Sequence, residues 1–188
     1  MKSVLKYYGS FALLTLLSSV SPAQTPATQI KDPAITQFET RAKAYAKERE
    51  RVERTLTPLP KQATPEQVAA HKAVFLKAVQ RSRAGAKHGA IFTPEIAQYF
   101  KKLMEVQLGI ADRAELRKEV IEAENKGVMV RVNYPYPEAQ EILEMPATLL
   151  QVMPQLPKQL RYRFVGRHML LVDRENSLIV DYIANAIP

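Results

Sequence analysis

The sequence of 188 residues contains no cysteine, which excludes disulfide bonds, a thiol nucleophile and a thiolate metal site. Its six glycines are scattered, and none forms the glycine-rich loop that cradles phosphate groups. Beyond residue 23, serine occurs only at Ser82 and Ser177, and neither lies in the GxSxG motif of a hydrolase nucleophile. No pair of carboxylates is set apart for acid–base chemistry. We therefore predict no catalytic residue and no cofactor, with an enzyme of unfamiliar design as the remaining alternative.

Histidine is also scarce, because His71, His88 and His168 are the whole set. No two of them stand at the HxxxH spacing, and neither CxxC nor the twelve-residue calcium loop occurs. His71 falls on the apolar stripe of a predicted helix. His88 follows near the end of that helix, where a cation complements the helix dipole. The residues by themselves predict no metal site.

Long apolar runs are limited to one, Phe11 to Val20, which follows the positive residues Lys2 and Lys6. Ten apolar residues are too few to span a bilayer, and a small-residue site ending at Ala23 comes directly after them. This pattern predicts a signal peptide over 1–23 that is cleaved before Gln24, and hence a periplasmic or secreted protein. We expect no transmembrane segment once the signal is removed.

The charge of the chain is positive. Removing Lys2 and Lys6 from the 27 basic residues leaves 25 against 19 acidic residues, a net charge of +6 for residues 24–188. Most of these charges alternate in sign along predicted helices, which is typical of a solvated face. The excess favours an acidic envelope component or an unknown protein as partner, whereas export argues against nucleic acid.

Residues 24–31 form a polar leader, and a single α+β domain is predicted to follow over 32–188. Its helical part (32–126) contains four start signals in which Asp or Thr precedes Pro or Glu, near residues 32, 64, 93 and 112. Apolar residues recur at helical spacing after each signal. In the first helix the stripe of Phe38, Ala42, Tyr45, Val52 and Leu56 is broken by Arg49. The first helix could also carry self-association.

The sheet part (127–188) is predicted to form three to four antiparallel strands. Alternation over 128–132 indicates a strand, and prolines leave room for only a short helix between about 147 and 153. Gly166-Arg167 fits a two-residue hairpin loop that pairs Val165 with His168. A four-residue loop over 174–177 would then pair Leu171 with Val180, which places one continuous apolar face against the helices. This face consists of Leu160, Tyr162, Phe164, Met169, Leu171, Leu178, Val180 and Tyr182.

The other face of this sheet is the first candidate site, because it carries Arg161, Arg163, His168 and Asp181 among apolar residues. One interpretation is an ion pair between Arg163 and Asp181 in neighbouring strands, worth at most about 1 kcal/mol if exposed. The alternative is an anion or partner site. The apolar half of this face needs a cover, either helices or another chain.

A second candidate is the basic cluster of Arg81, Arg83, Lys87 and His88 at the end of the second predicted helix. Positive charge gathered at one helix end is able to attract an acidic partner. The competing interpretation is a solvated helix end without a ligand.

The C-terminal stretch resembles the terminal hairpin of RcnB-like small bacterial periplasmic proteins. The matching pieces are Leu156-Pro157, Val165-Gly166, Leu170 to Asp173 and Leu178 to Asp181. The whole chain also resembles secreted bacterial proteins with the same ending. This resemblance implies an exported fold and a role in nickel and cobalt homeostasis. From the residues themselves we expect a non-catalytic envelope protein that binds a partner or ligand, with metal handling as the alternative.

Overall fold

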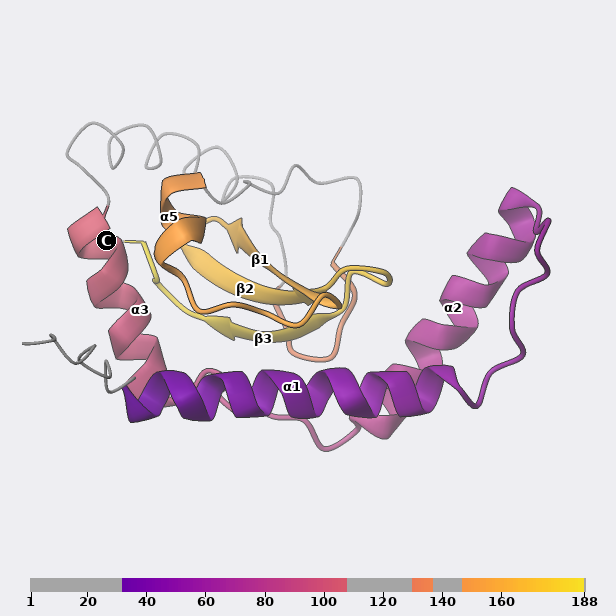
Figure 1. The fold of residues 1–188 in the computed structure, drawn as a ribbon, viewed down its shortest axis with the longest axis horizontal. Helices are drawn as coiled ribbons and strands as arrows, with labels where there is room; N and C mark the ends of the chain where they lie inside the picture. Colours follow the sequence, from indigo (N-terminus) through magenta and orange to yellow (C-terminus); the bar gives the residue numbers. More distant parts are fainter. Residues whose placement is uncertain (1–31, 108–129, 137–146, 188) are drawn as a thin grey trace, which may run out of the picture. The chain divides into compact units, whose positions relative to one another are not determined.

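The computed structural model describes residues 32–107, 130–136 and 147–187, and confirms an α+β fold of four helices followed by a three-stranded antiparallel sheet (Figure 1). The predicted signal peptide, the leader and the helix expected from Asp112 lie outside these residues. Among the helices that are described, none is both long enough and apolar enough to cross a bilayer. The helices are α1 (Pro33–Glu53), α2 (Pro65–Ser82), α3 (Pro94–Gln107) and α5 (Ala147–Val152).

The first three helices begin where their start signals predict. The Asp32 carboxylate accepts a hydrogen bond from the Ala34 amide at 2.8 Å, and proline occupies the first helical position. Thr64 and Gln67 form a reciprocal capping box at 3.3 and 2.9 Å. Each cap satisfies amides that have no partner inside the helix, so the sequence alone determines these boundaries.

The first hairpin has the predicted register. Strand β1 (Leu160–Val165) pairs with β2 (His168–Asp173), with Val165 opposite His168 and Leu160 opposite Asp173. Gly166 has a φ of 51°, the left-handed conformation that the first position of this turn requires and that glycine adopts without steric cost.

The predicted register of the second hairpin is wrong beyond its loop. Strand β3 (Ile179–Ile183) pairs Ile179 with Val172, but a β-bulge then places Asp181, not Val180, opposite Leu171. The extra residue shifts the alternation of the strand by one position. Ile183 and Asp181 therefore point to the helix side, and Tyr182 points to the opposite face.

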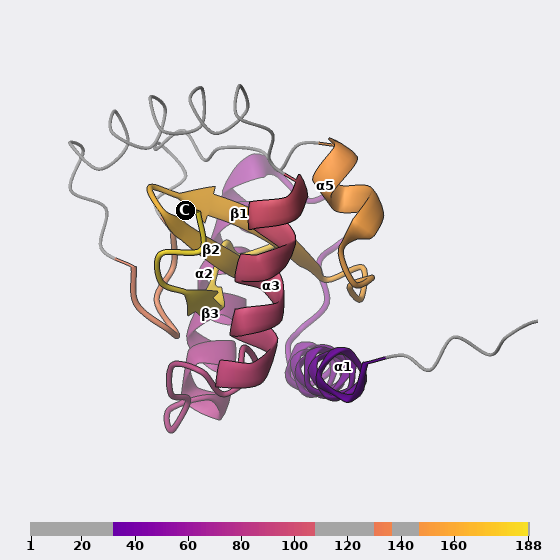
Figure 2. The same cartoon turned by 90° about the vertical axis from the view of Figure 1, so that its left-hand side faces the viewer.

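The main core lies between the helices and one face of the sheet. Figures 1 and 2 show α1 passing beneath the sheet, with α3 at one end of the strands. Phe38 of α1 stacks on Phe92 at 5.4 Å and meets the edges of Phe100 at the same distance, while Phe100 also contacts Tyr162 of β1. Such ring pairs add about 0.5–1.5 kcal/mol each beyond simple burial. Aromatic residues of three helix or loop segments thus attach the helices to the sheet.

The second face of the sheet packs against residues 130–136. Val165, Leu170, Val172 and Ile179 are buried there together with Tyr136. The strand predicted over 128–132 is not formed in its described part, because the chain turns at Asn133, which has a φ of 66°. Asn133 and Tyr136 instead donate amide hydrogen bonds to Ile179 and Ser177 at 2.8 Å. Within the described residues, a short loop pairing therefore borders β3 where a fourth strand was predicted.

Candidate functional site

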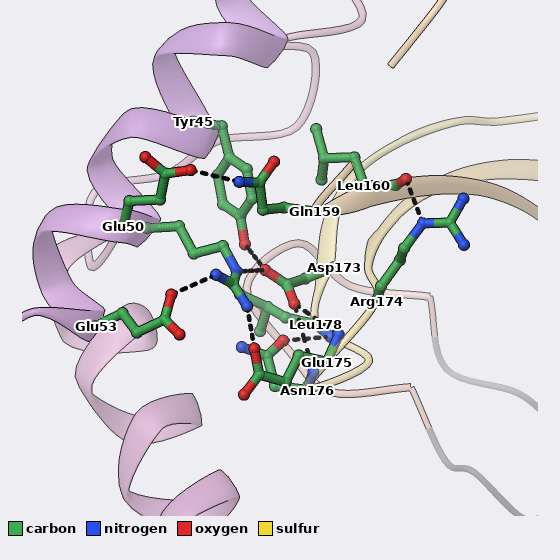
Figure 3. A network of polar contacts seen from close by, with 11 residues as sticks. Tyr45, Glu50, Glu53, Gln159, Leu160, Asp173, Arg174, Glu175, Asn176 and Leu178 are labelled. Carbon is green, nitrogen blue, oxygen red and sulfur yellow. Dashed lines mark hydrogen bonds and ion pairs between the residues drawn. The ribbon is translucent and has the colours of Figure 1, made fainter. Parts of the chain in front are cut away.

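A dense polar network among the described residues centres on Arg49 of α1. Its Nε donates to Asp173 Oδ2 at 2.8 Å, its Nη1 donates to Glu53 at 2.8 Å, and its Nη2 donates to Glu175. Asp173 is the last residue of β2, and Glu175 belongs to the loop that follows (Figure 3). The guanidinium therefore joins the first helix to the last hairpin.

Asp173 is fully buried, and within the described residues it accepts four hydrogen bonds. Oδ2 accepts from Tyr45 Oη at 2.8 Å as well as from Arg49, and Oδ1 accepts from the amides of Glu175 and Asn176 (Figure 3). Burial raises the pKa of Tyr45 far above its usual value, and the neighbouring charge of Asp173 raises it further. The Tyr45 phenol therefore stays protonated and serves as a donor.

Burial and the neighbouring carboxylates act in opposite directions on Arg49, and the carboxylates keep it charged. Burial alone would lower its pKa, but the charges of Asp173, Glu175 and Glu53 outweigh that effect and raise it. A permanently charged cation shared among carboxylates holds elements together but transfers no proton at neutral pH. We assign this network a structural role.

Sequence reasoning missed this network, although a signal for it was present. Arg49 occupies the helical position four residues after Tyr45, on the stripe that Phe38 and Ala42 begin. A charged residue on a buried stripe requires a buried partner of opposite sign, because an isolated charge is too costly to desolvate. Asp173, which ends a strand of apolar residues, was the candidate for this buried partner of opposite charge.

Asp181, a member of the first predicted site, lies elsewhere than expected. It is fully buried, and its two oxygens accept hydrogen bonds from four main-chain amides. Oδ2 accepts from Ile91 and Phe92 at 2.8 and 2.9 Å, while Oδ1 accepts from Gly89 and Tyr182 at 3.0 and 2.9 Å. The carboxylate therefore fixes the loop before α3 to β3 and is not available to a ligand.

The predicted basic cluster is dispersed by the fold. Arg83 turns inward, where its guanidinium lies 4.8 Å from the Tyr45 ring and donates to the Val180 carbonyl at 2.9 Å. Burial lowers the pKa of Arg83. His88 is exposed but stacks on Tyr182 at 4.0 Å and contacts its carbonyl, and the side chains of Arg81 and Lys87 are also exposed.

His168 shares the face of the sheet that carries Arg161 and Arg163, since it lies opposite Val165 in the neighbouring strand. It is half-buried at the start of β2, with its ring edge-on to Tyr182 at 6.1 Å. Tyr182 thus lies between His168 and His88. These contacts place both histidines against the Tyr182 ring of β3.

Arg161 and Arg163 do come together, in a groove of about 400 Å³ beside β1. We use the name cationic groove for the hollow that these two residues line together with Lys158 and Arg174. The segment from Met153 to Pro157 and the α5 residue Leu150 complete its wall. None of the described lining residues is acidic. An anion in this groove would meet no carboxylate from the described lining residues.

Three described carboxylates line an adjoining hollow, and each already has a partner. Lys158 and Arg174 also border a second hollow of about 370 Å³ that Glu50, Glu53 and Glu175 line. Glu53 and Glu175 are bound by Arg49, and Glu50 accepts from Gln159 (Figure 3). Arg174 uses its Nε to donate to the Leu160 carbonyl at 2.9 Å, and its side chain is exposed. Within the described residues, neither Lys158 nor Arg174 forms an ion pair.

The part of the chain that the structure describes contains no group of three or more His, Asp or Glu side chains arranged to hold a metal ion. Comparison with known proteins adds no constraint, because no protein-family model, curated protein or solved structure matches the chain. Of the chemistry that the described residues offer, anion binding in the cationic groove is the best supported.

Proposed function

We propose that this chain is an exported, non-catalytic protein that binds an acidic component of the cell envelope in the cationic groove. The observation that carries the proposal is the lining of the groove, which has four cations and no acidic residue among its described members. A hollow lined by charge of one sign concentrates ions of the opposite sign and favours their binding.

The residues that line the groove also favour binding over catalysis. Guanidinium groups are permanently charged and suit the recognition of carboxylate or phosphate, but they neither abstract protons nor attack a substrate. Neither a described histidine nor a described carboxylate lines the groove beside Arg161, Arg163 and Arg174. The groove is therefore suited to holding an anion rather than to transforming one.

The test compares two matched double variants of the chain purified from its own cell envelope. Lys158→Gln/Arg174→Gln removes two exposed cations from the groove, and Arg81→Gln/Lys87→Gln removes two from the end of α2. Both pairs combine one lysine with one arginine whose Nε donates to a main-chain carbonyl. The two variants therefore have the same net charge and comparable local losses.

Affinity for inorganic polyphosphate, a soluble polyanion, is measured by titration at low and high salt. We expect the groove variant to bind roughly three- to tenfold more weakly at low salt, and the α2 variant to bind as the natural chain does. The difference should shrink as salt screens the charges. Equal losses in both variants would show that net charge alone drives binding and would contradict the proposal. A metal retained in native mass spectrometry would favour the alternative of metal handling.

A further inference from the structure

The wall of the cationic groove bears an apolar feature that a soluble anion does not require. Leu150 and Val152 of α5 are 51% and 40% exposed, whereas Leu149 of the same helix is buried in the core. Leu150 lines the cationic groove itself, and Val152 lines the adjoining hollow of about 640 Å³ on the other side of Met153 to Pro157. The exposed side chain of Leu150 therefore lines the same groove as the exposed cations Lys158 and Arg174.

This combination is the one that a lipid surface recognises. An anionic bilayer offers phosphate groups at its surface and acyl chains just beneath them, so cations and aliphatic side chains bind it together. Polyanions in solution offer only the charges. In this short helix Leu149 is buried in the core, whereas Leu150 and Val152 remain exposed.

We infer that the acidic component is an anionic lipid surface, on which Lys158 and Arg174 contact phosphate groups while Leu150 and Val152 insert below them. This inference rests on the proposed function, because it uses the same groove. It adds a contribution of Leu150 and Val152 to the binding free energy, which a soluble polyanion without acyl chains does not provide.

The contribution of α5 is tested by Leu150→Gln/Val152→Gln. The matched control is Leu59→Gln/Val74→Gln, which changes the same residue types at comparable exposures of 39% and 51%. Binding is measured by co-sedimentation with phosphatidylcholine vesicles that contain phosphatidylglycerol, and with polyphosphate as before. We expect the α5 variant to lose roughly tenfold or more in vesicle binding, without a change in polyphosphate affinity. The control variant should match the natural chain in both measurements.

A single tryptophan gives a second readout, because the sequence contains none. Fluorescence of Leu150→Trp should shift to shorter wavelength on phosphatidylglycerol-containing vesicles but not on polyphosphate, whereas Leu59→Trp should shift on neither. If vesicle binding depends on Lys158 and Arg174 but not on Leu150 and Val152, and the fluorescence stays unshifted, the lipid inference is overturned while the groove keeps its function. If the Lys158→Gln/Arg174→Gln change affects neither probe, the proposed function itself fails.

Discussion

Asp173 and Asp181 are both fully buried in the same small sheet, yet they are stabilised in different ways. Asp173 is bound by two side chains of α1, Arg49 and Tyr45, and by two amides of its own loop. Among the described residues, the hydrogen bonds that Asp181 accepts come from four main-chain amides, three of which belong to residues 89–92. One buried charge is therefore hydrogen-bonded to a cation, whereas the other is hydrogen-bonded to main-chain amides and interacts with the charge of Arg83 at longer range.

This difference shows what each contact demands of the sequence. The contact at Asp173 depends on residue types, because only arginine supplies the forked donors that reach Asp173, Glu53 and Glu175 at once. The contact at Asp181 depends on the conformation of a loop, since amides are present whatever the side chains are. Substitutions can test whether the two sites respond in these two ways.

The largest effect is expected from Asp181→Ala, which leaves the amides of Gly89, Ile91 and Phe92 buried without an acceptor. Each such loss costs about 1–3 kcal/mol, so we expect the free energy of unfolding to fall by about 4 kcal/mol. Urea unfolding measures it. Asp181→Asn, which keeps one acceptor oxygen, should lie between this variant and the natural chain. A loss below about 1 kcal/mol for the alanine variant would mean that water replaces the carboxylate.

The second effect concerns the cation at Asp173. Arg49→Met keeps much of the apolar volume but leaves a buried carboxylate without its cation, and we expect a loss of about 3 kcal/mol. Adding Asp173→Asn removes the uncompensated charge, while Oδ1 still accepts from Glu175 and Asn176. The double variant should then be more stable than the sum of the two single losses predicts. Strict additivity in urea unfolding would show that Arg49 and Asp173 are not energetically coupled.

These two sites also separate what the sequence predicts from what it leaves open. Helix starts and the first hairpin depend on neighbouring residues such as Asp32, Thr64 and Gly166, so local patterns were sufficient. Arg49 was visible as a charge on a buried stripe, but its partner lies 124 positions away. No local pattern links the two positions.

The bulge in β3 could not be read from the sequence. Residues 178–183 read LIVDYI, in which both alternating sets contain two aliphatic residues and one polar or aromatic residue. Periodicity alone therefore cannot select a face for Asp181. Its four amide donors decide the matter, and three of them lie about 90 residues earlier in the chain.

Of the four cations that line the cationic groove, two were predicted from the sequence as site residues. Arg161 and Arg163 alternate along one strand, so their common face was predictable from period two. Lys158 and Arg174 flank β1 and β2 in the neighbouring loops, and only the path of the loops brings them into the same groove.

A smaller effect is expected at the phenol that completes the Asp173 contact. Tyr45→Phe removes one buried hydrogen bond and should cost about 1–1.5 kcal/mol near neutral pH. Because the pKa of Tyr45 is raised above 10.0 in the folded chain, its stabilising contribution is complete below pH 10.0 and is lost as the pH rises beyond it. The reason is that the Tyr45 phenol ionises at a lower pH in the unfolded chain than in the folded chain.

Urea unfolding of the natural chain and the Tyr45→Phe variant, near neutral pH and above pH 10.0, checks both parts of this prediction. The decline of stability at alkaline pH should be shallower in the variant. It should not vanish, because burial also raises the pKa of Tyr162. An unchanged decline would argue that Tyr45 ionises in the folded chain.

The smallest effect tests the tolerance of the Asp181 contact. Gly89 has a φ of 80°, and a Cβ atom there would meet only the Phe92 carbonyl oxygen at 3.7 Å, an ordinary contact. Gly89→Ala should therefore keep every hydrogen bond to Asp181 and cost only the strain of the left-handed conformation, about 1 kcal/mol. Gly85→Ala is the matched control, because a Cβ there meets nothing within 4 Å and its φ is not left-handed.

Hydrogen exchange distinguishes strain from loss of the contact. If residues 89–92 hold Asp181 by conformation alone, the amides of Ile91 and Phe92 should stay protected in Gly89→Ala, apart from the change in global stability. Selective loss of their protection would mean that the loop conformation fails when one residue is strained. The main-chain contact would then be as sensitive to residue type as the arginine contact at Asp173, and the contrast between the two aspartates would not hold.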